Sequence, residues 1–126
     1  MPTASSYTIS DSATLKEVIG RINESGGKQL LVLNAHKKVL GVIGDGDVRR
    51  AVFRGVLISA PVIDFMTTSF IAVEEKNVKR LRELFAEHLI STIPVINHRG
   101  QLLKVATISG PDYKIQTLKY AESPAK

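Results

Sequence analysis

The chain has 126 residues, of which 44% are hydrophobic and 23% charged, a composition typical of one compact globular domain. It contains no cysteine, which excludes disulfides, thiolate metal sites and cysteine nucleophiles and fits a cytoplasmic location. The longest unbroken aliphatic run is Leu30–Leu33, far too short to span a membrane, and the polar start of the chain predicts no signal peptide.

Seventeen basic residues against twelve acidic ones give a formal net charge of +5. Positive charge of this size can serve nucleic acid, a membrane surface or a small phosphorylated ligand. The basic residues are spread along the chain, and three tyrosines and four phenylalanines without tryptophan supply few stacking partners for single strands. The sequence therefore argues against a nucleic-acid partner.

The first half of the chain predicts a strand, a helix, two strands and a second helix. Thr14-Leu15-Lys16-Glu17 has capping-box spacing, and apolar residues then recur at helical intervals. The expected segments are a polar, frayed start at 1–6, a short strand at 7–9, a helix stopped by Ser25-Gly26-Gly27, a strand at 29–33, a hairpin turn at 34–38, a strand at 39–43, and a helix that follows Gly44-Asp45-Gly46 and ends near Gly55.

A connection at 56–69, with a helical turn near Pro61, leads into a second half of the same order. Asn77 is expected to cap a helix that carries Val78, Leu81 and Leu84 and extends to Leu89. The remaining expected segments are strands at 92–96 and 101–108, a last helix opened by Gly110-Pro111 and running through Ile115 and Leu118, and a solvated tail at 122–126.

The two halves are similar when the sequence is laid on itself with an offset of 63 positions. The offset places Leu15 on Val78, Leu30 on Ile93, and Asn34 on Asn97. Two units that each leave an apolar face uncovered bury it against one another. Such a pair has clefts between its halves, and clefts of this kind favour small ligands.

Three further stretches carry a family resemblance: Phe65-Met66-Thr67, Ile93-Pro94-Val95-Ile96, and Gly41-Val42-Ile43 followed by Asp47. Both halves resemble cystathionine-β-synthase-type (CBS) domains, and the whole resembles a CBS pair. The stretch at 41–50 is similar to pairs that precede sugar-phosphate nucleotidyltransferase domains. The resemblance implies an α/β fold, a tandem CBS-domain pair in which two β-α-β-β-α repeats pack with pseudo-twofold symmetry, the first at 7–57 and the second at 58–120.

The resemblance also implies a function. Such pairs are regulatory modules that hold an adenine nucleotide (AMP, ADP or ATP) in the inter-repeat cleft, associate as homodimers through their helices, and modulate a fused or partner catalytic domain. Two alternatives remain open at this point. The chain can be a structural dimerisation module without a ligand, or the N-terminal regulatory fragment of a sugar-phosphate nucleotidyltransferase.

In the family, a run of glycine, two apolar residues, Thr or Ser, two further residues and Asp supplies a hydroxyl and a ribose-binding carboxylate. Asp47 matches the aspartate and Gly41 the glycine, but Gly44 stands at the hydroxyl position. In the second half Thr107 matches the hydroxyl, whereas Gly110 replaces the aspartate. The resemblance therefore implies one working cleft around Asp47 rather than two.

The residues themselves allow more than one reading of this segment. A carboxylate at Asp47, where a strand gives way to a helix, can accept from two ribose hydroxyls, or it can only stabilise the helix start. Gly44 and Gly46 let backbone amides approach a phosphate, or simply form a tight turn. Of Arg49 and Arg50, neighbours about 100° apart on a helix, only one is expected to face a phosphate.

Other candidates lie elsewhere in the chain. Thr8, Ile9 and Leu30 are candidates for the adenine pocket, with core packing as the alternative and the stronger one for Leu30. By the resemblance, the polar residues that precede an apolar strand reach the phosphates; these are Lys28, Ser91 and Thr92. Ordinary polarity at a strand edge explains them equally well.

We expect neither a metal site nor catalysis. Asp45 and Asp47 lack a clustered third ligand, so no metal is expected. His36, His88 and His98 have no evident nucleophile beside them, so we do not expect an enzyme.

Overall fold

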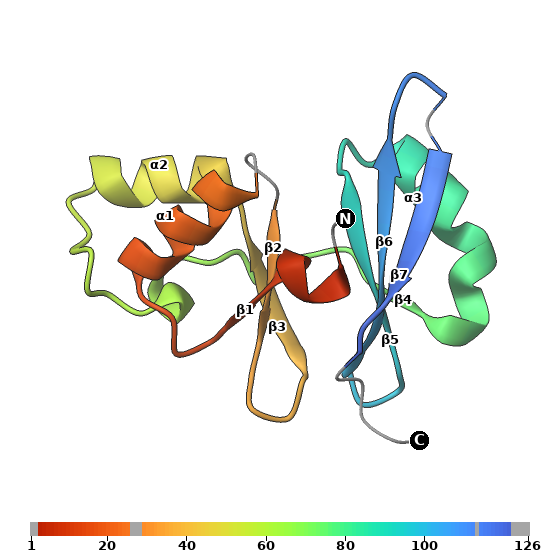
Figure 1. Cartoon of the computed structure of the whole chain (residues 1–126), viewed down its shortest axis with the longest axis horizontal. Coiled ribbons are helices and arrows are strands. Elements are labelled where there is room, and N and C mark those ends of the chain that lie inside the picture. The colour runs from red at the N-terminus through yellow and green to blue at the C-terminus, as the bar shows by residue number, and fades with distance from the viewer. Residues whose placement is uncertain (1–2, 26–28, 113, 122–126) are drawn as a thin grey trace.

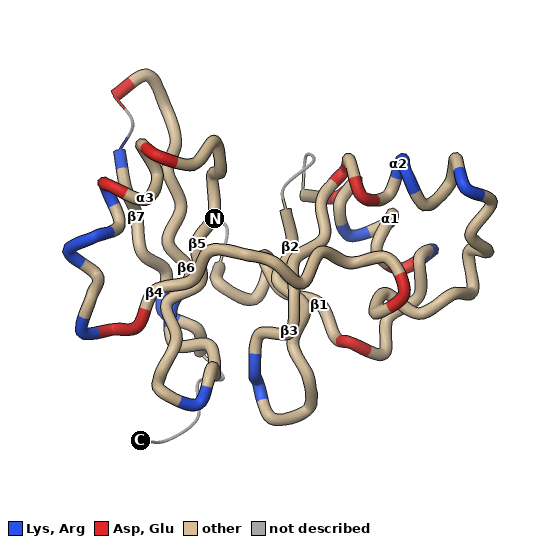
Figure 2. The backbone as a smooth tube through the Cα atoms, turned by 180° about the vertical axis from the view of Figure 1, so that it is seen from behind, with Lys and Arg blue, Asp and Glu red and all other residues tan. Residues whose placement is uncertain are grey.

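The computed structural model describes residues 3–25, 29–112 and 114–121. Two β-sheets stand side by side at the centre of the molecule, and helices cover the outer side of each sheet (Figure 1). Seen from behind, the connection between the repeats crosses the middle of the molecule, and most charged residues lie on the outer helices and the hairpin turns (Figure 2). Within the described ranges, none of the helices has the length and apolar character needed to cross a bilayer.

The first repeat forms a three-stranded sheet in the order β1-β2-β3, with β1 parallel and β3 antiparallel to β2. Its elements are the 3-10 helix η1 (Ala4–Tyr7), β1 (Thr8–Ser10), α1 (Leu15–Glu24), β2 (Leu30–Leu33), β3 (Val39–Ile43) and α2 (Asp45–Phe53). The predicted capping box is confirmed, because Thr14 Oγ1 accepts from the Glu17 backbone N–H and the Glu17 carboxylate accepts from that of Thr14. Gly26, Gly27 and Lys28 lie outside the described residues.

The apolar run of β2 has partners on both sides of the sheet. Side chains alternate between the two faces of a strand. Leu30 and Val32 pack against α1 and α2, whereas Leu31 and Leu33 pack against the second sheet. Burial of each such side chain contributes about 1.5–3 kcal/mol, so the strand fixes both the helices and the neighbouring repeat.

The second repeat forms a four-stranded sheet in the order β4-β5-β6-β7. The connection to it contains the 3-10 helix η2 (Val62–Asp64), which confirms the helical turn predicted after Pro61. The remaining elements are β4 (Val73–Glu74), η3 (Glu75–Arg80), α3 (Leu81–Glu87), β5 (Thr92–Ile96), β6 (Leu102–Ser109) and β7 (Lys114–Lys119).

The predicted last helix of the second repeat is wrong, because β7 runs antiparallel along β6 in its place. Ile115 and Leu118 are three residues apart, which fits one face of a helix but puts them on opposite faces of a strand. This sheet is covered on both sides. Ile115 therefore packs with the α3 cluster, and Leu118 packs in the core between the sheets.

Two smaller predictions also need correction. Asn77 does not cap a helix: it lies inside η3 with non-helical backbone angles, α3 begins only at Leu81, and Leu89 is exposed beyond the end of α3. The start of the chain is not frayed from residue 3 onward, because η1 packs against the sheets and buries Ala4. Residues 1–2 and the predicted tail at 122–126 lie outside the described residues.

The hairpin turns of the two repeats are joined by a pair of symmetric backbone hydrogen bonds. The N–H of Val39 donates to the carbonyl of Gly100 at 3.0 Å. The N–H of Leu102 donates to the carbonyl of Lys37 at 2.9 Å. The 63-position offset converts the first bond into the second, so a pseudo-twofold axis passes between the turns. The predicted α/β fold of two paired repeats is confirmed, although the second repeat ends in a strand.

Candidate functional site

Asp47 lies in the first turn of α2, directly beyond β3, and its side chain is only 11% exposed. One carboxylate oxygen, Oδ2, accepts from the backbone N–H of Gly44 at 2.9 Å. The other, Oδ1, accepts from Arg50 Nη2 at 2.7 Å and from Thr67 Oγ1 at 2.8 Å. The carboxylate thus accepts from a backbone N–H at the start of α2 and also links α2 to the connection between the repeats.

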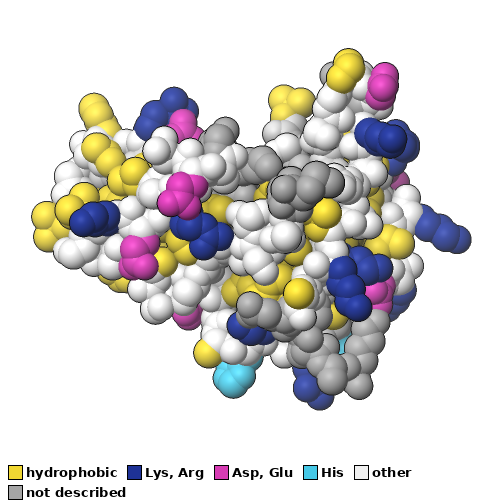
Figure 3. All heavy atoms as spheres, in the orientation of Figure 1, with side chains coloured by type: hydrophobic (Ala, Val, Ile, Leu, Met, Phe, Trp, Pro, Cys, Tyr) yellow, Lys and Arg dark blue, Asp and Glu magenta, His cyan; other side chains and the backbone are white. Residues whose placement is uncertain are grey.

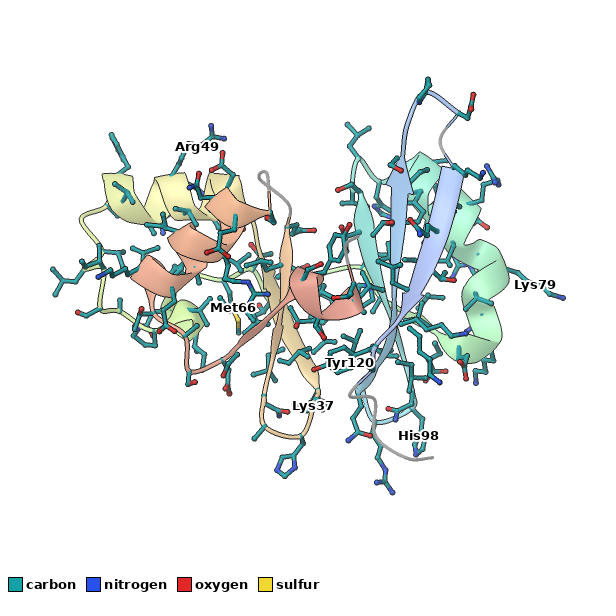
Figure 4. All side chains as sticks on the ribbon, viewed as in Figure 1. Lys37, Arg49, Met66, Lys79, His98 and Tyr120 are labelled. Carbon is teal, nitrogen blue, oxygen red and sulfur yellow. The ribbon has the colours of Figure 1, made fainter. Side chains whose placement is uncertain are left out.

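Thr67 reaches Asp47 because the connection crosses close over β3. The backbone of Val42 and that of Thr67 exchange two hydrogen bonds of 2.8 Å. A Cβ on Gly41 would lie 2.7 Å from the Thr67 carbonyl oxygen and 2.9 Å from the Met66 sulfur. The glycine of the motif is therefore required for this approach, and Figure 4 shows Met66 beside the first sheet.

Space remains beside Gly44, where the family motif has a hydroxyl. A Cβ at Gly44 would have Asp47 Oδ2 and the Gln29 side chain as its nearest neighbours, each 3.9 Å away. Gln29 directly precedes β2 and corresponds to Thr92 by the repeat offset. A side chain at position 44 would therefore lie between the Asp47 carboxylate and the Gln29 side chain with ordinary van der Waals contacts.

The two adjacent arginines of α2 differ in direction, as their helical spacing predicts. Arg50 turns back over the helix start to pair with Asp47, and its Nη1 is 3.4 Å from the position of a Cβ on Gly46. Arg49 pairs with Asp45 at 3.5 Å on the solvent side and points outward (Figure 4). Only Arg50 therefore lies next to the Asp47 carboxylate.

The structure brings Ser91, Thr92 and Thr107 together, but in a different place. They line a pocket of about 200 Å³ at the start of β5 and the end of β6. The other lining residues are Tyr7, Ile108, Ser109 and Gln116. Asp47 and Arg50 do not belong to the lining of this pocket.

Thr8 and Ile9 line a third place, a pocket of about 540 Å³ beyond the carboxyl end of β1, together with Arg21, Lys37 and Tyr120. Figure 4 shows Lys37 on the hairpin turn and Tyr120 near the seam between the sheets. Leu30 is fully buried in the core beneath α1 and α2, which is the packing role that the sequence favoured for it.

Sequence reasoning missed Gln29, Tyr7, Thr67 and Gln116 at these places, and also Arg21, Lys37 and Tyr120. The repeat offset places Gln29 on Thr92 and Tyr7 on Phe70, so the repeat itself carried a signal for the first two. Thr67 was noted only as part of a resembling stretch. Gln116 was placed in a helix, so its position on the sheet was hidden.

The described residues contain no group of three or more His, Asp or Glu side chains placed to hold a metal ion. The three histidines lie in turns or just beyond a helix end. His36 and His98 lie in the two hairpin turns, and His88 follows α3 with its ring 3.9 Å from Glu87.

Comparisons with known sequences show a likeness to one family in the first part of the chain. Residues 1–54 match the model of the CBS domain. Arabinose 5-phosphate isomerase GutQ from Shigella flexneri is 26% identical over 92 residues, which cover 72% of this chain and 29% of that protein. The chain spans between 23% and 30% of the length of the curated relatives that it matches.

Solved structures extend the likeness to most of the chain. A CBS domain protein from Pyrobaculum aerophilum, complexed with AMP, has a TM-score of 0.65 and 20% identity, covering 85% of this chain and 87% of that one. The CbpB protein of Listeria monocytogenes, complexed with c-di-AMP, has a TM-score of 0.71 and 19% identity, covering 85% and 84%. Residues 1–54 are thus similar to the CBS-domain model, and the chain as a whole has the fold of a CBS-domain pair.

Proposed function

We propose that this chain is a regulatory module that binds an adenine nucleotide beside Asp47. The observation that carries the proposal is the placement of a largely buried carboxylate at the start of α2, with the guanidinium of Arg50 directly on it. Two proteins of the same fold are complexed with AMP and with c-di-AMP, ligands that share an adenosine monophosphate unit. These complexes support the ligand class.

The Asp47 carboxylate retains capacity for a ribose. A carboxylate oxygen has two lone pairs, and Oδ2 accepts only the Gly44 N–H. A ribose hydroxyl can therefore donate to the remaining lone pair of Oδ2. Gly44 places no side chain beside Oδ2, and the Gln29 side chain is the other neighbour of this position.

Arg50 provides the charge for a phosphate. Its guanidinium has five N–H donors, is largely exposed, and makes its ion pair with Asp47 through Nη2. The remaining donors lie over the first turn of a nine-residue helix, whose free N–H groups and dipole favour anions. A phosphate held there would be contacted by Arg50 and by the helix start together.

Titration with AMP, ADP and ATP, followed by calorimetry and by backbone amide NMR, tests this proposal. We expect saturable binding with the largest shifts at residues 44–50 and 67. A folded protein that gives no heat and no shifts with any of the three nucleotides would contradict it.

An exposed apolar surface supports a partner role alongside ligand binding. Val52, Phe53, Leu57, Ile58 and Ile63 are exposed at the end of α2 and in the following connection. Hydrophobic side chains gather at this end of the molecule (Figure 3). Exposed apolar patches mark interaction sites. We propose that this surface forms a homodimer or contacts a fused or partner catalytic domain, while the module itself is not an enzyme.

The same surface favours a second candidate function, a dimerisation module that has lost its ligand. The glycine at position 44 and the three internal hydrogen bonds to Asp47 are consistent with that alternative. The nucleotide titration separates the two, because a ligand-free scaffold forms a dimer and does not respond to nucleotide.

A further inference from the structure

Strand β7 forms a free edge of the second sheet. The order β4-β5-β6-β7 leaves one side of β7 without a neighbouring strand, and the strand lies at the front of this sheet in Figure 1. It is six residues long and pairs with β6 in one unbroken register. A long and regular edge strand can pair with another chain, so this edge calls for an explanation.

The ladder between β6 and β7 shows which backbone groups point outward. Just beyond β7, the N–H of Tyr120 donates at 3.0 Å to the carbonyl of Leu103, which lies opposite it in the register of the two strands. In an antiparallel pair, residues that bond the neighbouring strand alternate with residues that do not. The even-numbered residues of β7 therefore bond β6. The backbone N–H and carbonyl groups of the others point away from it; these are Ile115, Thr117 and Lys119.

The other strand edges are short or covered. β1 has three residues and β4 has two, and the connection between the repeats bonds the edge of β3, where Thr67 and Val42 exchange two hydrogen bonds. In contrast, no described residue makes a hydrogen bond to the outward backbone groups of β7. This edge is thus the longest one in the described part of the chain that is open to an added strand.

The edge is positively charged. β7 has a lysine at each end, and neither lysine has an ion pair among the described residues. Lys119 lies directly opposite Lys104, and like charges in this arrangement are destabilising. Lys104 pairs with Glu75 at 3.4 Å, whereas Lys114 and Lys119 have no such compensation. A carboxylate brought to this edge would therefore meet a cation that has no partner.

The two lysines also decide between the possible occupants. If a second copy of the chain paired along the whole of β7 in the antiparallel direction, Lys114 of each copy would lie opposite Lys119 of the other. Lysines on an edge strand oppose self-association in this way. An acidic strand would instead place a carboxylate beside each lysine. We propose that β7 accepts an extended acidic segment of a partner protein, which adds a strand to the four-stranded sheet.

The side chains of β7 define the pattern of this segment. Ile115 packs with the α3 cluster, and Leu118 packs in the core between the sheets. An apolar residue opposite each of them would extend both cores. The segment is therefore acidic at both ends and apolar next to each end, with two polar residues between, and this pattern is the same in either strand direction. In such an added strand the main-chain hydrogen bonds supply affinity and the side chains supply specificity. The edge is separate from the nucleotide site proposed at Asp47.

Backbone amide NMR of the full chain tests the proposal with the blocked peptide Glu-Val-Thr-Thr-Val-Glu as the probe. We expect saturable shifts centred on β7, and hydrogen exchange of the outward amides of Ile115, Thr117 and Lys119 at least tenfold slower at saturation. The control peptide has lysine in place of both glutamates and should bind at least tenfold more weakly. The proposal is overturned if the acidic peptide causes no saturable shifts on β7, or if the two peptides bind equally well.

Two variants separate backbone pairing from charge attraction. Thr117→Pro removes an outward N–H, a position where an edge strand tolerates proline, and it should weaken the acidic peptide at least tenfold. The double variant Lys114→Glu with Lys119→Glu should reverse the preference, so that the basic peptide binds more tightly than the acidic one. Full affinity in a folded Thr117→Pro variant would overturn the proposal, and so would an unreversed preference. Protection of the Thr117 amide that disappears when the free protein is diluted would assign the edge to a second copy of the chain instead.

Discussion

The hydroxyl of Thr67 donates to a carboxylate oxygen of Asp47 at 2.8 Å, although the two residues are 20 positions apart in the chain. This bond links the start of α2 to the connection that leads into the second repeat. The carboxylate that we propose as a ribose acceptor is thereby in direct contact with the segment that joins the two halves. A ligand can shift the arrangement of the repeats only if it binds two arrangements unequally. The contact between Asp47 and Thr67 can couple a ligand at Asp47 to the position of the connection.

Asp47→Asn tests the ribose role. It removes the charge but keeps an acceptor oxygen for the helix start, so we expect nucleotide affinity to fall by about 1–3 kcal/mol with a small change in stability. Asp45→Asn is the matched control, because Asp45 is exposed and pairs only with Arg49. Calorimetric titration of both variants checks this. Equal affinities in the two variants would remove Asp47 from the site.

Arg50→Ala tests the phosphate role, with Arg49→Ala as its control. The two arginines are adjacent in α2, but only Arg50 lies on the Asp47 carboxylate. We expect Arg50→Ala to weaken AMP by at least tenfold and to leave binding of adenosine nearly unchanged, because adenosine has no phosphate. Arg49→Ala should bind both ligands as the unchanged protein does. A uniform loss for AMP and adenosine would assign Arg50 to the nucleoside part instead.

Gly41→Ala is expected to destabilise the fold. The added Cβ would lie 2.7 Å from the Thr67 carbonyl oxygen, so the connection must move away from β3 and lose its two backbone bonds. Overpacking of this kind costs about 1–3 kcal/mol. Gly44→Ser is the control, because a Cβ there makes only ordinary van der Waals contacts and serine is a good helix N-cap. It should change the free energy of unfolding by no more than a few tenths of a kcal/mol. Urea unfolding measures both, and equal midpoints would contradict the crowding at Gly41.

The sequence predicted most of the first repeat because local signals and tertiary contacts agree there. The Thr14 capping box and the glycines at 44 and 46 fix the helix starts, and the apolar run of β2 is buried on both sides. The repeat offset also predicted the pairing of the halves, because the equivalent hairpin turns of the repeats bind each other. The last strand could not be predicted in this way. The spacing of Ile115 and Leu118 fits a helix, and only the presence of two separate cores makes a strand the better arrangement.

The candidate site was predicted less completely than the fold. Asp47 was predicted because it terminates a recognisable run, and its ligand role stays a prediction. Helical geometry correctly required Arg49 and Arg50 to diverge. The contact with Thr67 depends on how closely the connection crosses Gly41, which no local pattern encodes. Thr92 and Thr107 were found as polar residues, but their pocket is completed by a strand that was expected to be a helix.

The hairpin turns offer a symmetric test of backbone strain. Lys37 and Gly100 occupy equivalent positions, and both have positive φ angles, 67° and 81°. A left-handed conformation costs a residue with a Cβ about 1–2 kcal/mol. Gly100→Ala should therefore lower the free energy of unfolding by about that amount, whereas Lys37→Gly should raise it by up to about 1 kcal/mol. Urea unfolding measures both changes, and equal signs for the two variants would contradict this reading of the turns.

The proposed partner surface can be tested by placing a charge in it. Phe53 is 93% exposed at the end of α2, in the part of the chain that holds most of the exposed apolar residues, and Leu89, in the second repeat, is fully exposed. If the surface around Phe53 forms a dimer, a buried carboxylate there has no partner and is costly. Phe53→Glu should thus shift the protein to a monomer in light scattering after gel filtration, and Leu89→Glu should keep the dimer. A dimer that survives Phe53→Glu at low micromolar concentration would place the interface elsewhere, and a monomeric parent protein would leave this surface to a fused or partner domain.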